Sequence, residues 1–199
     1  MKARLAQLTS GIINPFLVSF LLILLLSFNS ADTMSEAIKW ALILTGISIL
    51  PVLAVIIYLV HNDRIEGIFI NIRRQRHKIF VLAGICMVIG CALLVYLSAP
   101  MVLIATYVST LASTVVFMLI NFFWKISLHA AFTSGSVAVL TILFGTLGAF
   151  TAVLLPAVAW ARIELKQHSF AQVTAGSVLA AAIVVVVFHF FGLIGSTPI

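Results

Sequence analysis

Long uninterrupted apolar runs dominate this chain, and its few charged residues lie almost entirely between those runs. Of the 199 residues, 63% are hydrophobic and only 8% are Asp, Glu, Lys or Arg. A soluble fold could not bury so much apolar surface. The runs are continuous rather than alternating, which excludes an outer-membrane β-barrel. The sequence therefore predicts an all-α polytopic transmembrane helical bundle, formed as a single integral membrane domain over residues 1–199.

Hydropathy predicts about seven membrane-spanning helices. The uncharged stretch from His129 to Ala161 forms either one long helix or two short ones, and Gly145-Thr146-Leu147-Gly148 near its middle is a turn signal that favours two. Ser98-Ala99-Pro100 predicts a tight hairpin turn, and the polar segment 61–78 predicts an amphipathic interfacial helix. The other expected spans cover residues 12–28, 38–60, 79–97, 101–122 and 172–194.

The basic residues favour seven helices over six. With seven, the N-terminus and the loops 61–78, 122–129 and 161–168 share one membrane face. That face carries ten basic residues, and the other face has only Lys39. By the positive-inside rule the basic face and the N-terminus are cytoplasmic, in a plasma or cytoplasmic membrane. The ten are Lys2, Arg4, Arg64, Arg73, Arg74, Arg76, Lys78, Lys125, Arg162 and Lys166.

The net charge of +6 is explained by these loops and by anionic lipid headgroups, so the expected partner is the lipid bilayer and not nucleic acid. Cys86 and Cys91 lie five residues apart in one apolar run, a spacing that does not bring them together on a helix. We expect buried thiols, no metal site and no cofactor.

Three basic segments at helix ends would meet at the cytoplasmic face: 73–78, 125–129 and 162–168. Arg binds phosphate oxygens in a bidentate manner, Lys adds a point charge, and a helix N-terminus offers backbone N–H groups. Two histidines, His129 and His168, suit phosphoryl transfer, one as nucleophile and one as general acid. The segments therefore predict a phosphate site at the level of the lipid headgroups.

The spacing within these segments resembles a known family. Arg162, five residues, His168, three residues and Gln172 resemble the third signature of the type-2 phosphatidic acid phosphatase superfamily, which is Ser-Arg, five residues, His, three residues, Asp. Ser127-Leu128-His129 resembles the second signature, Pro-Ser-Gly-His. The cluster 73–78 has the position of the first signature, a Lys or Arg followed by a spaced Arg-Pro, although no Pro follows it here.

The resemblance implies a metal-independent mechanism. His168 would attack phosphorus to form a phosphohistidine, and His129 would protonate the leaving group. Arg162, with Arg73 or Arg76, would hold the phosphoryl oxygens. The implied function is hydrolysis of a lipid phosphate or an isoprenoid diphosphate.

Several residues depart from the family pattern. Gln172 stands where the family has Asp, so it can orient His168 but brings no negative charge to stabilise the imidazolium. Leu128 replaces Gly in the second signature. Lys125 and Ser127 are expected as further phosphate contacts, Lys125 being one that the usual motif lacks.

Two alternatives remain open. The resemblance covers roughly residues 60–185, a phosphatase-like core that leaves the first two helices outside. Gln172 favours a catalytically weak or inactive member of the same fold that binds lipid headgroups or a partner protein. The third possibility is a small transporter. His189, expected deep in the last helix and hydrogen-bonded to a neighbouring helix, is its only ionisable candidate at mid-membrane.

Overall fold

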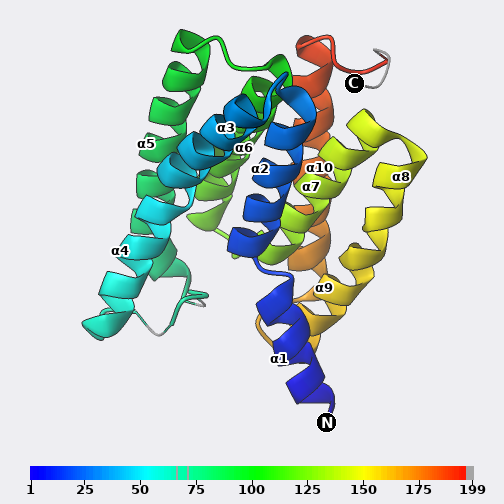
Figure 1. Ribbon diagram of the computed structural model, residues 1–199. Coiled ribbons are helices and arrows are strands. Elements are labelled where there is room, and N and C mark those ends of the chain that lie inside the picture. The colour runs from blue at the N-terminus through cyan, green and yellow to red at the C-terminus, as the bar shows by residue number, and fades with distance from the viewer. Residues whose placement is uncertain (66, 71, 196–199) are drawn as a thin grey trace. The chain divides into compact units, whose positions relative to one another are not determined.

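The computed structural model describes residues 1–65, 67–70 and 72–195, and within these ranges it contains helices and no strand (Figure 1). This confirms the all-α prediction. In chain order the elements are α1 (Lys2–Ile12), α2 (Pro15–Ser30), α3 (Met34–Ser48), α4 (Leu50–His61), α5 (Arg73–Tyr96), α6 (Met101–Asn121), α7 (Leu128–Phe144), α8 (Thr146–Ala149), the 3₁₀ helix η1 (Phe150–Val153), α9 (Leu154–Glu164) and α10 (Phe170–Phe190).

Among the described residues, six helical stretches are long and apolar enough to cross a membrane, so the chain is an integral membrane protein. A seventh apolar helix, α7, has 17 residues. The stretch from His129 to Ala161 thus forms two helical segments, separated at Gly145, whose φ of +56° suits glycine. The six stretches are Lys2–Ser30, Met34–His61, Arg73–Tyr96, Met101–Asn121, Thr146–Glu164 and Phe170–Phe190.

The first helix differs from its prediction, because helical structure starts near the N-terminus and breaks before Pro15. Pro15 is the first residue of α2, where its missing N–H costs nothing. Asn14 bridges the break: its Oδ1 accepts from Leu17 N at 3.0 Å, and its Nδ2 donates to Gly11 O at 2.7 Å. The predicted span of 12–28 missed all of α1 except its last residue.

The predicted interfacial helix at 61–78 is wrong for the described residues. Those between the end of α4 and the start of α5 form turns and bends. The chain reverses at Asp63, whose φ is +53°. Of the residues in the expected apolar stripe, Ile65 is buried whereas Ile68 and Ile72 are exposed, so they do not form one membrane-facing stripe.

The fold divides into two compact units, which we call the terminal unit (Met1–Leu22 with Lys125–Ile199) and the central unit (Ile23–Trp124). In the terminal unit, α1 packs on α9, and α7 packs on α10 and on α8. In the central unit, α5 and α6 form the predicted hairpin, and α3 and α4 contact α5. This division groups α1 with the C-terminal helices.

Gly148 allows the chain to turn back on α7. A Cβ there would overlap the Leu140 carbonyl and lie 2.7 Å from Thr141 N. We expect Gly148→Ala to lower the free energy of unfolding by about 2–3 kcal/mol, because backbone atoms would have to move apart. The midpoint of thermal unfolding in detergent measures this. Gly46→Ala is the control, since its Cβ meets nothing within 4 Å; equal midpoints for the two variants would contradict the close approach.

Candidate functional site

The spacing between Arg162 and His168 is produced by the end of α9. Lys166 N donates to Ile163 O at 2.9 Å and Gln167 N donates to Arg162 O at 3.1 Å, with Lys166 at a φ of +52°. This pattern is a Schellman motif. It places His168 immediately before Ser169, which caps the next helix, so the five-residue interval is the length of one helix-to-helix turn.

His168 is oriented by Gln172 in the first turn of α10. The distance between His168 Nδ1 and Gln172 Oε1 is 3.1 Å, and only 6% of His168 is exposed. Gln172 Oε1 also accepts from Ser169 N at 3.2 Å, while Ser169 Oγ accepts from Gln172 N at 3.3 Å, completing a capping box. Because an amide oxygen only accepts, this contact requires a proton on Nδ1, and in the neutral imidazole the lone pair is then on Nε2.

The start of α7 lies against the first turns of α10. Ser127 N donates to Gln172 O at 3.3 Å, and Gly176 is so close that a Cβ on it would be 2.7 Å from Ser127 O. Ser127 is fully buried, its side chain does not cap α7, and its hydroxyl has no hydrogen-bond partner among the described residues. His129, two residues on, is 5% exposed. The second and third signature segments are thus neighbours.

Lys125 binds the loop that carries the predicted nucleophile. Its Nζ donates to Gln167 O at 2.7 Å, joining the segment before α7 to the residue before His168. The expected role was a phosphate contact. The structure shows a main-chain contact in the same part of the terminal unit.

Arg162 is anchored by a residue that sequence reasoning missed. Its Nη1 donates to Ser10 Oγ at 2.8 Å, although the two residues are 152 positions apart, and Arg162 is 2% exposed. Ser10 lies on α1, which the family resemblance leaves outside the core. The available signal was the pair Ala6 and Ser10, since small residues four apart allow close helix packing in membranes, and both are buried.

Arg73 and Arg76 belong to the central unit, so they are not placed with the other site residues. Arg73 Nη1 donates to Phe122 O at 2.6 Å, at the C-terminus of α6, where a cation complements the helix dipole. Asn121 Nδ2 returns a 3.2 Å bond to Arg73 O. Arg76 is 6% exposed, and its Nε donates to Ile70 O at 2.7 Å. Both guanidinium groups hold main-chain carbonyls.

His189 does not lie where it was expected. It is in the last turn of α10, it is exposed, and it meets the ring of Phe190 edge-on at 6.2 Å. The predicted hydrogen bond to a neighbouring helix is absent among the described residues. Within the described ranges, no three His, Cys, Asp or Glu residues are grouped as a metal site would require.

Comparison with known proteins identifies no relative. No protein-family model matches the chain, and no curated protein or solved structure is significantly similar to it.

Proposed function

We propose that this integral membrane protein is a phosphatase that hydrolyses a lipid phosphate or an isoprenoid diphosphate through a phosphohistidine intermediate. The observation that carries the proposal is the 3.1 Å contact between His168 Nδ1 and Gln172 Oε1. A nucleophilic imidazole needs its Nδ1 proton held so that Nε2 presents a lone pair to phosphorus, and this contact holds it.

The reaction proceeds in two steps. His168 Nε2 attacks phosphorus, a P–N bond forms, and the P–O bond to the leaving group breaks as protonated His129 gives its proton to that oxygen. Water then attacks the phosphohistidine, neutral His129 takes the proton of the water, and inorganic phosphate leaves with His168 restored. Both steps need cations or N–H donors at the phosphoryl oxygens, because charge gathers there in the transition state.

Three groups in the terminal unit supply those donors. Arg162 offers a planar fork of N–H groups, and its contact with Ser10 fixes one arm. The hydroxyl of Ser127 is a buried donor with no described partner. The first turn of α7 has no side-chain cap, so its amides suit an anion at the positive end of the helix dipole.

The direct test is phosphate release by the purified full chain in detergent, measured in the presence of a metal chelator. The panel contains phosphatidic acid, phosphatidylglycerophosphate, and short and long prenyl diphosphates. We expect release from one substrate class. A folded protein that releases phosphate from none of them would contradict the proposal.

The weakened orienting residue leads to a gain-of-function prediction. Gln172→Glu keeps the side-chain length and the capping box but adds a carboxylate beside Nδ1, which stabilises the imidazolium. We expect turnover to rise about tenfold, and Gln172→Asp to raise it less because its shorter chain loosens the cap. Initial rates at saturating substrate measure this, with Gln7→Glu, an exposed change on α1, as the control. An unchanged or lower rate in Gln172→Glu would count against His168 as the nucleophile.

One observation favours a second candidate, a lipid-phosphate binder without turnover. The cationic groups of the site already serve the protein, since Lys125 holds Gln167 O and Arg162 holds Ser10 Oγ. Binding of phosphatidic acid without phosphate release from any substrate is the result that separates this candidate from the enzyme.

We place the N-terminus and the basic loops on the cytoplasmic face of a plasma or cytoplasmic membrane, on the support of ten basic residues against Lys39. The test uses a variant that carries Lys2→Cys and lacks Cys86 and Cys91. Intact cells that express it are treated with a membrane-impermeant thiol reagent, and labelling reports the orientation. Protection of that cysteine is the expected result.

A further inference from the structure

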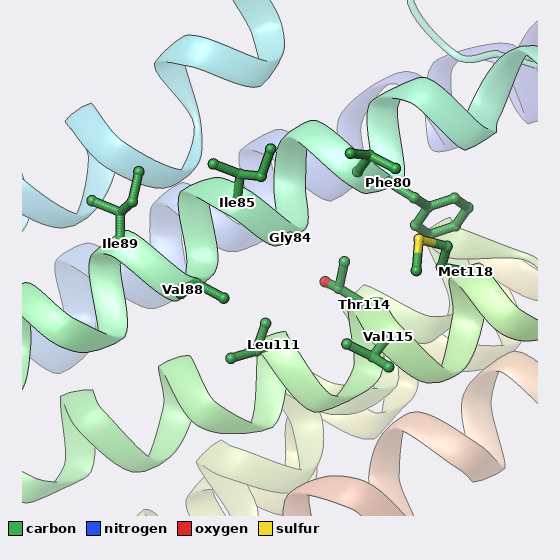
Figure 2. Close-up of a pocket in the computed structure, with 10 residues that line it drawn as sticks. Phe80, Gly84, Ile85, Val88, Ile89, Leu111, Thr114, Val115 and Met118 are labelled. Carbon is green, nitrogen blue, oxygen red and sulfur yellow. The ribbon is translucent and has the colours of Figure 1, made fainter.

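An apolar groove runs between α5 and α6 within the central unit. It has a volume of about 390 Å³, within the range of small-molecule sites. Figure 2 shows Val88 on α5 facing Leu111 and Thr114 on α6, with Phe80 and Met118 at one end. The Thr114 hydroxyl donates to Thr110 O at 2.8 Å, so the polar group is already satisfied. The lining therefore suits a hydrocarbon chain.

The groove is open on its α5 side. Ile85, Val88 and Ile89 are each between 54% and 56% exposed, and a Cβ added to Gly84 would meet nothing within 4 Å. Both helices are candidate membrane spans, so the surrounding medium is lipid. The missing side chain at Gly84 leaves the space that deepens the groove (Figure 2).

Two cations continue the same face of α5 beyond the end of the groove. Arg74 and Lys78 precede Val81 and Ile85 at spacings of four, three and four residues, which keeps all four on one helix face. Both cations are exposed, and within the described part of the chain neither has a hydrogen-bond or ion-pair partner. They differ in this from Arg73 and Arg76, which bind main-chain oxygens.

The length of the groove matches one leaflet of a bilayer. From Phe80 to Ile89 the axis of α5 advances about 14 Å, at about 1.5 Å per residue. Half of the hydrocarbon core is about 15 Å. A lipid whose headgroup lies at Lys78 can thus extend one acyl chain along the whole groove.

We propose that this groove binds an anionic phospholipid, with one acyl chain between α5 and α6 and the phosphate at Arg74 and Lys78. The site lies entirely in the central unit and is independent of the proposed phosphatase activity. The anionic headgroup is the discriminating part, because the groove alone would accept any chain, whereas basic residues at the headgroup level attract negative charge.

The test measures dissociation constants of phosphatidylglycerol and of phosphatidylcholine with the same acyl chains by native mass spectrometry of the full chain. Gly84→Leu places a side chain in the groove, where its Cβ would meet nothing within 4 Å, and Gly46→Leu, whose Cβ is equally unobstructed, is its control in α3. We expect Gly84→Leu to weaken the binding of phosphatidylglycerol about tenfold, which is the effect of losing the burial of about two methylenes. If the Gly84→Leu protein binds phosphatidylglycerol as tightly as wild type does, the proposed site is wrong.

The headgroup is tested separately. Arg74→Gln with Lys78→Gln should weaken the binding of phosphatidylglycerol about 30-fold and leave that of phosphatidylcholine unchanged, since each cation near the surface contributes about fivefold. The control removes the same charge elsewhere, in Lys2→Gln with Arg4→Gln. Equal binding of the two lipids by wild type, or an equal loss in the control, would overturn the assignment of an anionic lipid.

Discussion

Replacing His168 with alanine is expected to abolish phosphate release, lowering turnover by about 10⁴-fold or more. The variant has no imidazole to form the P–N bond, and the remaining groups can only bind and polarise the substrate. Initial rates of phosphate release at saturating substrate measure the loss. When the wild-type reaction is run with radiolabelled substrate and then quenched, it should also yield an acid-labile phosphoprotein that the variant lacks.

The matched control is His189→Ala, which removes an exposed imidazole at the other end of α10 and should leave the rate unchanged. Thermal unfolding midpoints of both variants that match wild type would show that the lower rate is not caused by a loss of structure. Turnover and phosphoprotein that persist in His168→Ala would refute the phosphohistidine mechanism.

Arg162→Lys is expected to lower turnover by about 10²–10³-fold, the usual effect of removing one transition-state donor. Lysine keeps the positive charge but loses the planar fork, so it cannot present separate nitrogens to Ser10 Oγ and to a phosphoryl oxygen. Because substrate binding depends mainly on charge, the KM should change much less than kcat. Steady-state kinetics on the substrate identified by the panel separate the two constants.

Arg4→Lys, a change of the same kind at an exposed position on α1, is the control. The kcat of Ser10→Ala should lie between those of wild type and Arg162→Lys, because the Arg162 guanidinium remains but loses its anchor. A Ser10→Ala protein with a lower unfolding midpoint but full kcat would show that the contact only stabilises the packing of α1 on α9.

Local features of the candidate site follow from the sequence. The turn from Arg162 to His168 is built from short-range hydrogen bonds that close α9 and cap α10, so motif spacing predicts it. Gln172 likewise reaches His168 from one helical turn away. Such contacts depend on neighbours along the chain and need no knowledge of tertiary packing.

Long-range assignments could not be made in this way. Basic side chains near helix ends look alike in sequence, yet Arg73 and Arg76 bind carbonyls of the central unit, whereas Arg162 reaches Ser10 on α1. Counting loop charges placed all three on one face, but it could not say which acceptor each one meets. The acceptor of Arg76 lies six residues away along the chain, but the packing of the helices supplies those of Arg73 and Arg162.

The sequence by itself determined that this is an all-α membrane protein, where most of its helices lie, and that α9 is followed by a histidine held at the start of α10. Tertiary structure decided that α1 belongs with α7, α9 and α10, and that a groove separates α5 from α6. The physical reason is that lipid-facing and protein-facing surfaces of membrane helices are both apolar. Hydropathy therefore identifies the helices but carries little information about which of them are neighbours.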